Sequence, residues 1–163
     1  MEMEIVVAGA VVKKQQMAIS ALAMMQRLKI VSSEEWLKNQ VQKIVLSDKE
    51  ALKEEKIDEW THGLRPDGSI IGTYRDPEYA YFKQQVNPLA SGNVDLLLTR
   101  ETANSLFVTP ASKGFIFRMN DRHNLIGKYG NEILGLNQEW FNNRQRDIYR
   151  YVLMQDLKKI LNK

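Results

Sequence analysis

The sequence predicts an α+β protein in which a small antiparallel β-sheet is flanked by a long N-terminal helical region and a C-terminal helix. Apolar residues recur at helical spacing through most of residues 13–63. Short runs of branched and aromatic residues, typical of strands, follow between residues 94 and 118. A second helical pattern begins at Asn137. This separation of helical and strand-like segments is typical of the α+β class.

Residues 1–163 are predicted to form a single domain, because a chain of this length can bury one hydrophobic core. Its predicted parts are a helical region (1–63), a loop with a short helix (64–93), a sheet region (94–136) and a C-terminal helix (137–163). Apolar residues make up 44% of the chain and charged residues 26%. That balance is typical of a folded globular protein and not of a disordered chain.

Residues 13–29 are predicted to form a first helix, rich in Ala, Met and Gln. Met17, Ala21, Met24 and Met25 recur at helical spacing and form an apolar stripe. Such a stripe most often packs into the core of its own protein, which is the outcome we expect. Methionine side chains also serve adaptable interfaces with other molecules, and this alternative stays open.

Residues 32–63 carry the clearest helix signals. Ser32 and Glu35 have the spacing of a capping box, in which the serine accepts a bond from a free backbone N–H and the glutamate reaches back. The same pattern recurs at Ser47–Glu50. The segment is therefore either one helix or two helices with a break near Leu46.

The middle of the chain is predicted to be a loop with one short helix. Arg65–Gly68 has the composition of a turn, because proline presets φ and glycine permits the reversal. A short helix is predicted at residues 77–83, with Pro77 at its first position.

Three runs of branched and aromatic residues predict strands at Val94–Thr99, Ser105–Thr109 and Gly114–Arg118. Ala111–Gly114 is predicted to be the hairpin turn between the last two. Because neighbouring residues of a strand point to opposite faces, we expect only one of Leu106 and Phe107 to enter the core.

The C-terminal helix is predicted to begin after Asn137, a residue that suits the N-cap position. Its buried stripe is predicted to contain Phe141, Ile148, Val152 and Leu157, which recur at helical spacing.

No catalytic or metal-binding motif is recognisable. The chain has no cysteine, which excludes disulfides and thiolate metal sites. Its two histidines, His62 and His123, lie far apart in the sequence. Asp121, Arg122 and His123 bring an acid, a cation and a base together, but a plain loop explains them better than proton transfer does. We expect a protein that is not an enzyme and that binds no cofactor and no metal.

We also expect no membrane partner. The longest apolar run, Ile5–Val12, is far shorter than a membrane span. It follows Glu2 and Glu4, whereas a signal peptide begins with basic residues. These features predict a protein made and kept inside a cell, or inside a particle assembled there.

The basic residues are concentrated in the C-terminal part of the chain. Residues 111–163 contain ten Lys and Arg against five Asp and Glu, a net charge of +5, while the whole chain carries +3. This part can face DNA or an acidic partner, or it can be an ordinary solvated surface.

Three arginines of the C-terminal helix, Arg144, Arg146 and Arg150, are candidates for a DNA-facing or protein-facing surface. Arg146 and Arg150 lie one helical turn apart. Exposed arginines contribute little to folding, so we expect the chain to fold when all three are changed to Glu.

Three tyrosines, Tyr74, Tyr79 and Tyr81, form a second candidate surface close to Arg75 and Lys83. Aromatic rings beside cations hold single-stranded nucleic acid. The same residue types anchor protein interfaces. An interface or packing in the core is the outcome that we expect.

The segments Val94–Val108, Gly114–Met119 and Leu125–Leu136, followed by one long helix, resemble in their order the tail-completion or neck family of tailed-bacteriophage structural proteins. In that family a Leu-x-x-Thr-Gly-x-x-x-x-Ser segment leads into a compact antiparallel sheet. Arg100 stands where the family usually has Gly, and a turn with positive φ would strain an arginine there.

A second segment resembles structural proteins of Bacteroidetes phages. The residues that carry this similarity are Gly68–Tyr74, Lys83, Asn87–Pro88 and Gly92–Leu96.

These resemblances imply a virion structural protein of the neck or tail, either a head–tail connector or a component of a tail-completion ring. The partners they imply are copies of the same chain in a ring, the portal or other neck and tail proteins, and packaged DNA. The implied location is the virion, assembled in the host cytoplasm. The alternative is a small nucleic-acid-binding protein that uses its basic C-terminal half.

Overall fold

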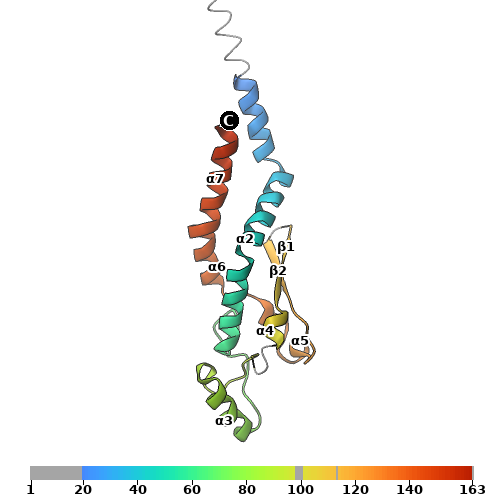
Figure 1. The fold of residues 1–163 in the computed structure, drawn as a ribbon, viewed down its shortest axis with the longest axis vertical. Helices are drawn as coiled ribbons and strands as arrows, with labels where there is room; N and C mark the ends of the chain where they lie inside the picture. Colours follow the sequence, from blue (N-terminus) through green and yellow to red (C-terminus); the bar gives the residue numbers. More distant parts are fainter. Residues whose placement is uncertain (1–19, 98–100, 113, 163) are drawn as a thin grey trace, which may run out of the picture.

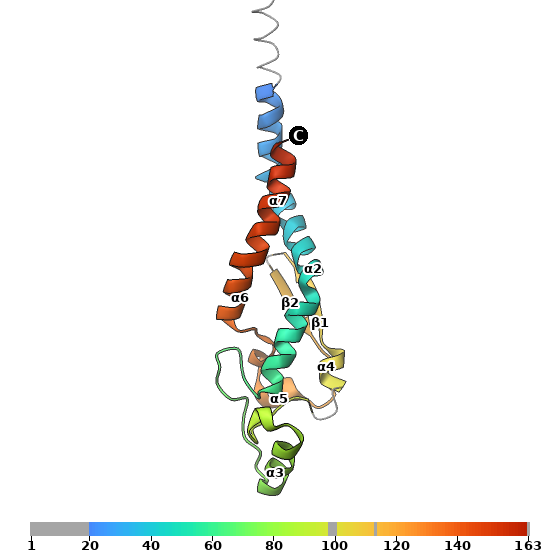
Figure 2. The ribbon, with the colours of Figure 1, turned by 60° about the vertical axis from the view of Figure 1, so that its left-hand side comes forward.

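The computed structural model describes residues 20–97, 101–112 and 114–162, and it has the predicted α+β fold. The molecule is elongated, with helix α2 (Glu34–Thr61) running through much of its length (Figure 1). Residues 20–31 form a further helix that precedes α2. The C-terminal helices return along α2, so that the C-terminus lies beside residues 20–31 in both views (Figures 1 and 2).

The remaining elements follow α2 in an order close to the predicted one. They are α3 (Pro77–Val86), the 3-10 helix η1 (Pro88–Ala90), α4 (Glu101–Ser105), β1 (Phe107–Ala111), β2 (Gly114–Arg118), α5 (Leu125–Tyr129), the 3-10 helix η2 (Asn131–Leu134), α6 (Gln138–Arg144), the π-helix η3 (Gln145–Tyr149) and α7 (Arg150–Leu161). Helix α3 lies at the end of the molecule opposite residues 20–31 (Figure 1).

The cap of α2 lies one residue beyond the predicted position. Ser33, and not Ser32, is the N-cap residue, and its hydroxyl accepts a hydrogen bond from the Trp36 backbone N–H at 3.2 Å. The Ser32 hydroxyl instead donates to the Lys29 carbonyl at the end of the preceding helix. The capping box predicted at Ser32 is therefore wrong, because Ser32 still belongs to the turn that ends the first helix.

We expect Ser33→Ala to lower the free energy of unfolding by about 1 kcal/mol, because it removes the cap of the first helical turn. Ser32→Ala is the matched control and should change the free energy by less than about 0.5 kcal/mol. Urea denaturation followed by circular dichroism measures both. An equal effect of the two substitutions would contradict the assignment of the cap.

Helix α2 continues without a break through the second capping-box pattern. Ser47 is inside the helix, and its hydroxyl donates to the Ile44 carbonyl in the preceding turn. Val45 and Leu52, on either side of the predicted break, are both buried in the core. Packing of one continuous apolar face therefore outweighs the local capping signal, as tertiary contacts commonly do.

The β-sheet is a single two-stranded hairpin. β1 and β2 pair antiparallel, with Phe107 opposite Arg118 and Ala111 opposite Gly114. The strand at Gly114–Arg118 and the hairpin that follows Ala111 are confirmed, although residue 113 of the turn lies outside the described residues. The other strand begins at Phe107 and not at Ser105, because Ser105 is the last residue of α4.

The strand predicted at Val94–Thr99 is wrong for residues 94–97, and residues 98–100, including Arg100, lie outside the described part of the chain. Among the described residues, the pairing nearest this segment is an isolated bridge between Thr73 and Asn93. Val94, Asp95 and Leu96 are all buried. Three consecutive buried residues do not fit a strand with one exposed face, where alternate residues would point outward.

The core lies between α2, the hairpin and the loops beneath them. It contains Val45, Leu52, Trp60, Ile71, Val94, Leu96, Leu106, Phe117 and Ile133. Trp60 is completely buried. Its indole N–H donates to the Ile133 carbonyl at 3.0 Å and so joins η2 to α2.

Lys56 is also fully buried and pairs with Glu59 one turn away, and burial lowers the pKa of Lys56.

The C-terminal helix begins as predicted and is interrupted by a π-helix. The Asn137 side chain accepts from the Trp140 N–H at 2.9 Å and caps α6. The predicted buried stripe is only partly correct, since Phe141 packs against the core but Ile148 is exposed. Ile148 lies within η3, where the changed helical period turns it away from the expected face.

Candidate interaction surfaces

Arg144, the first of the three candidate arginines, is bound within the chain. Its guanidinium forms a two-pronged ion pair with Asp48 of α2, and its Nε lies 2.5 Å from the carboxylate. Tyr149 donates to the same carboxylate, and Arg144 also lies over the Trp140 ring, 5.2 Å from its centroid. Burial, together with Asp48, raises the pKa of Tyr149 well above its usual range, so its hydroxyl remains a donor.

The π-helix explains how two residues five apart reach one carboxylate. Hydrogen bonds in a π-helix join residues i and i+5 and bring such residues onto the same face. Arg144 and Tyr149 have this separation, and both bind Asp48. The assumption that all three arginines are exposed is therefore wrong for Arg144, whereas folding of the triple Glu variant stays a prediction.

Arg146 and Arg150 are exposed and remain candidates for a partner surface. Arg146 pairs with its neighbour Asp147 at 2.8 Å, a contact between two largely exposed side chains. Such a surface pair is worth about 0–1 kcal/mol, so an incoming phosphate or carboxylate can replace it at little cost. Arg150 lies at the rim of a groove described below.

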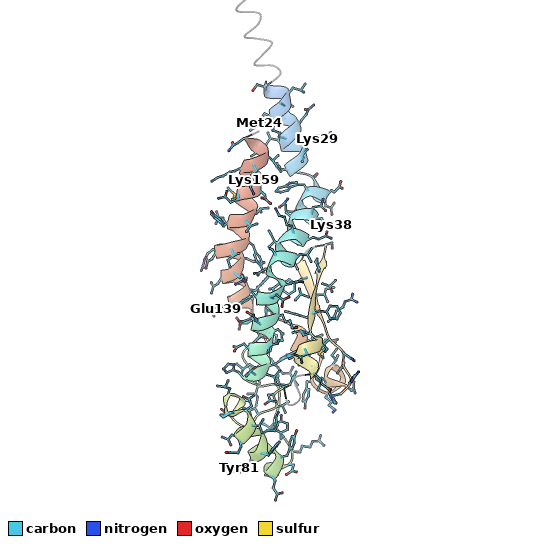
Figure 3. The ribbon with its side chains drawn as sticks, in the orientation of Figure 1. Met24, Lys29, Lys38, Tyr81, Glu139 and Lys159 are labelled. Carbon is cyan, nitrogen blue, oxygen red and sulfur yellow. The ribbon has the colours of Figure 1, made fainter. Side chains whose placement is uncertain are left out.

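Tyr79 and Tyr81 belong to α3, which lies at one end of the molecule, away from α6 and α7 (Figure 1), and Tyr74 packs against Tyr79. Tyr74 and Tyr79 form an edge-to-face pair with ring centroids 5.0 Å apart. Tyr81 is 66% exposed and lies at the very end of the molecule (Figure 3). Phe82, Val86 and Leu89 are exposed on the same part of the chain. This end is therefore an apolar surface of aromatic and aliphatic side chains.

Of the two cations close to these tyrosines in the sequence, Arg75 is exposed, but Lys83 is not available to a partner. The Lys83 ammonium is buried and bound to the Asp95 carboxylate. The Tyr74 hydroxyl accepts from the Asp95 N–H at 3.3 Å, and burial raises the pKa of Tyr74 to about 12. A hollow of about 250 Å³ lies beside Tyr74 and Lys83. These contacts fix the base of the aromatic end and give Lys83 a structural role.

Asp121, the acid of the Asp121–His123 cluster, caps the start of α5. The Asp121 carboxylate accepts hydrogen bonds from the backbone N–H groups of Leu125 and Ile126, the latter at 3.0 Å. It thus satisfies two free donors of α5. Within the described residues, no group of three or more His, Asp or Glu side chains is placed to hold a metal ion.

A groove of about 540 Å³ lies between α2, the hairpin and the C-terminal helices; we call it the α2 groove. Its lining from α2 consists of Leu37, Gln40, Val41, Ile44 and Val45. The opposite walls contain Gly114, Phe115, Phe141, Gln145, Tyr149, Arg150 and Leu153. The lining is mainly apolar, which is typical of a surface that receives an apolar partner.

Gln40 gives this groove an unsatisfied polar atom. The side-chain oxygen of Gln40 is buried and has no hydrogen-bond partner among the described residues. A buried acceptor without a donor costs about 1–3 kcal/mol. The Gln40 oxygen is thus a buried acceptor that a donor entering the groove can satisfy.

The methionine stripe predicted in the first helix is exposed and not part of the core. Met24, Met25 and Leu28 are 41%, 68% and 47% exposed, and Ala21 beside them is exposed as well. The opposite side of the helix contains the half-buried Arg27, which donates to the Leu161 carbonyl at the end of α7 at 3.3 Å. The expectation of core packing is wrong for Ala21, Met24 and Met25, and Met17 lies outside the described part.

Sequence reasoning identified the stripe as a pattern but missed the α2 groove. The groove is built from three segments that are distant in the sequence, and no local spacing signals their meeting. The pairing of Asp48 with Arg144 was missed for the same reason, since 96 residues separate them.

Among the described residues, no helix has the length and apolar content needed to cross a membrane. In comparisons with known proteins, no family model, no curated protein and no solved structure matches this chain.

Proposed function

We propose that this chain is a structural subunit of a tailed-bacteriophage particle, located at the neck or tail as a head–tail connector or tail-completion component. It works through contacts with copies of itself and with neighbouring proteins, and not through catalysis. A ring of identical subunits is the form that the resemblance of residues 94–136 to the neck family implies.

The observation that carries this proposal is the exposure of large apolar side chains at both ends of an elongated molecule. One end presents Met24, Met25 and Leu28, and the other presents Tyr81 and Phe82 (Figure 3). Exposed apolar surfaces of this kind mark sites of protein association. Two such surfaces on one subunit allow it to join more than one neighbour.

The shape supports the same role. Helix α2 has 28 residues, which at 1.5 Å each span about 42 Å. A subunit of this length can bridge proteins that do not touch each other, as a connector must. The ion pair Lys83–Asp95 joins α3 to the segment after η1, and the ion pair Arg144–Asp48 joins α6 to the middle of α2.

The test is to locate the chain in particles. Antibodies against it should label the head–tail junction or tail of particles purified from a lysate of the producing strain. Loss of its gene should leave filled heads and tails unjoined. Absence of the chain from purified particles, measured by mass spectrometry, would contradict the proposal.

The alternative, a nucleic-acid-binding protein, is favoured by the exposure of Arg146 and Arg150. We expect the double change of Arg146 and Arg150 to Glu to leave the circular dichroism spectrum unchanged and to impair particle assembly or DNA retention. Glu at exposed Lys38 and Lys49 of α2 is the matched control. Particles that assemble normally with the arginine variant would remove both residues from the site.

The two functions differ in what the purified chain does. A DNA-binding protein should bind DNA as a monomer, with an affinity that falls steeply with salt. A structural subunit should instead form a defined oligomer, alone or with its neck and tail partners. Light scattering at several salt concentrations, with and without DNA, separates these outcomes.

A further inference from the structure

In the described part of the chain, two apolar surfaces have no partner within one copy, and they match each other. The first is the methionine stripe, formed by Ala21, Met24, Met25 and Leu28, and the second is the α2 groove. We propose that the methionine stripe of one copy binds in the α2 groove of a second copy, with the incoming helix antiparallel to α2. This docking rests on the proposed function in one respect, namely that the chain associates with copies of itself.

The spacing of the two surfaces is the same. The stripe has apolar residues at positions i, i+3, i+4 and i+7 of its helix, from Ala21 to Leu28. The floor of the groove repeats this spacing on α2, from Leu37 to Ile44, with Gln40 and Val41 between them. An amphipathic helix that docks in a groove uses this pattern of anchor residues. Both surfaces extend over about two helical turns, so their lengths agree as well.

The chemistry of the side chains also fits. Methionine is flexible and fills irregular apolar spaces, and the groove has an irregular lining made by two helices and a hairpin. Its volume of about 540 Å³ is sufficient for several side chains. The buried Gln40 oxygen can gain a donor only from a group that enters this groove.

Charge sets the direction of the incoming helix. Residues 20–31 contain Arg27 and Lys29 and no acidic residue. The first turn of α2, at the end of the groove, contains Glu34 and Glu35, both exposed. An antiparallel helix with Leu28 over Leu37 brings its Lys29 beside these two carboxylates. The attraction between the Lys29 ammonium of one copy and the Glu34 and Glu35 carboxylates of the other favours the antiparallel orientation.

The stripe cannot reach the groove of its own chain. Residues 20–31 are joined to α2 by the turn at Ser32 and Ser33, so the stripe lies beyond the N-terminal end of the helix that lines the groove (Figure 1). Leu28 and Leu37 are nine residues apart, which is about 14 Å for two helices arranged end to end. The groove therefore has to receive the stripe from another copy.

Disulfide cross-linking tests the contact directly, because the chain has no cysteine of its own. Two full-length proteins are prepared, one with Leu28→Cys and one with Leu37→Cys, and they are mixed and oxidised. We expect a mixed disulfide dimer as the main product. A bond within one chain is excluded, because disulfides need Cα atoms within about 7 Å.

Leu46→Cys is the matched control for Leu37→Cys. Leu46 is as exposed as Leu37, at 55% against 51%, and it lies on the same helix but does not line the groove. It should give much less mixed disulfide with Leu28→Cys. Equal yields from the two partners, or a Leu28→Cys protein that links mainly to itself, would overturn the proposal.

Self-association of the purified chain provides the second test. Met25→Glu should weaken it about tenfold or more, as expected when a charge replaces an apolar anchor. Leu22→Glu is the control, since Leu22 is similarly exposed on the same helix but lies outside the stripe. Analytical ultracentrifugation over a range of concentrations measures the dissociation constants. A chain that stays monomeric throughout, or equal losses in the two variants, would overturn the docking.

These outcomes are separate from those of the particle experiment. If the chain is present at the neck but cross-links no better at Leu37 than at Leu46, the docking fails and the proposed function stands. If the cross-link forms but particles lack the chain, the docking stands and the phage role fails.

Discussion

Replacing Lys83 with methionine is expected to lower the free energy of unfolding by about 3–5 kcal/mol, because it leaves the Asp95 carboxylate buried without its counter-charge. The two side chains are 2% and 1% exposed and are bound to each other. Asp95 keeps the Asn87 amide as a donor at 2.8 Å, but a neutral amide does not balance a buried charge. The pair joins α3 to the segment after η1, so its loss should also loosen the aromatic end of the molecule.

The double variant Lys83→Met with Asp95→Asn is the control for this result. It removes both charges and keeps an oxygen that can accept from Asn87, so it should be more stable than Lys83→Met alone. Urea denaturation gives both free energies. If Lys83→Met unfolds within about 1 kcal/mol of the parent, the pair is not the buried anchor that the structure indicates.

The second large effect is expected at Leu106, where truncation to alanine should cost about 2–5 kcal/mol through lost burial and the cavity left behind. Leu106 is 2% exposed and belongs to the main core cluster. Its neighbour Phe107 is the first residue of β1 and is 52% exposed. Phe107→Ala is therefore the matched control and should cost much less.

Thermal and urea denaturation of the two variants decide which residue points inward. Equal denaturation midpoints for Leu106→Ala and the parent protein would mean that Leu106 is not part of the core beneath the hairpin. A larger loss at Phe107 than at Leu106 would reverse the orientation of the chain where it enters β1.

Several elements follow from local physical chemistry and could be predicted from the sequence. Pro77 begins α3, since its fixed φ suits the first turn and its missing N–H costs nothing there. Asn137 caps α6 through its own side chain. The strand Gly114–Arg118 follows from its branched and aromatic residues and a preceding hairpin turn. Each of these signals depends only on residues within a few positions of one another.

Other features depended on contacts between distant segments. The pattern at Ser47–Glu50 is a valid cap signal, but Val45 and Leu52 bury one face of α2 across it and keep the helix continuous. Arg144 looks like any basic surface residue until α6 is placed beside Asp48. Val94–Leu96 looks like a strand in the sequence. In the structure this segment is irregular and buried, and its Asp95 is bound to Lys83.

The sequence by itself determined the fold class, most helix positions, the hairpin and the existence of an apolar methionine stripe. Only the tertiary structure decided that the stripe is exposed, that a groove of matching spacing lies on the next helix, and which charges are bound within the chain. The physical reason is that helical periodicity and capping are local properties of the backbone and its nearest side chains. Burial depends instead on which segments meet in space, and residues such as Asp48 and Arg144 meet only when the whole chain is folded.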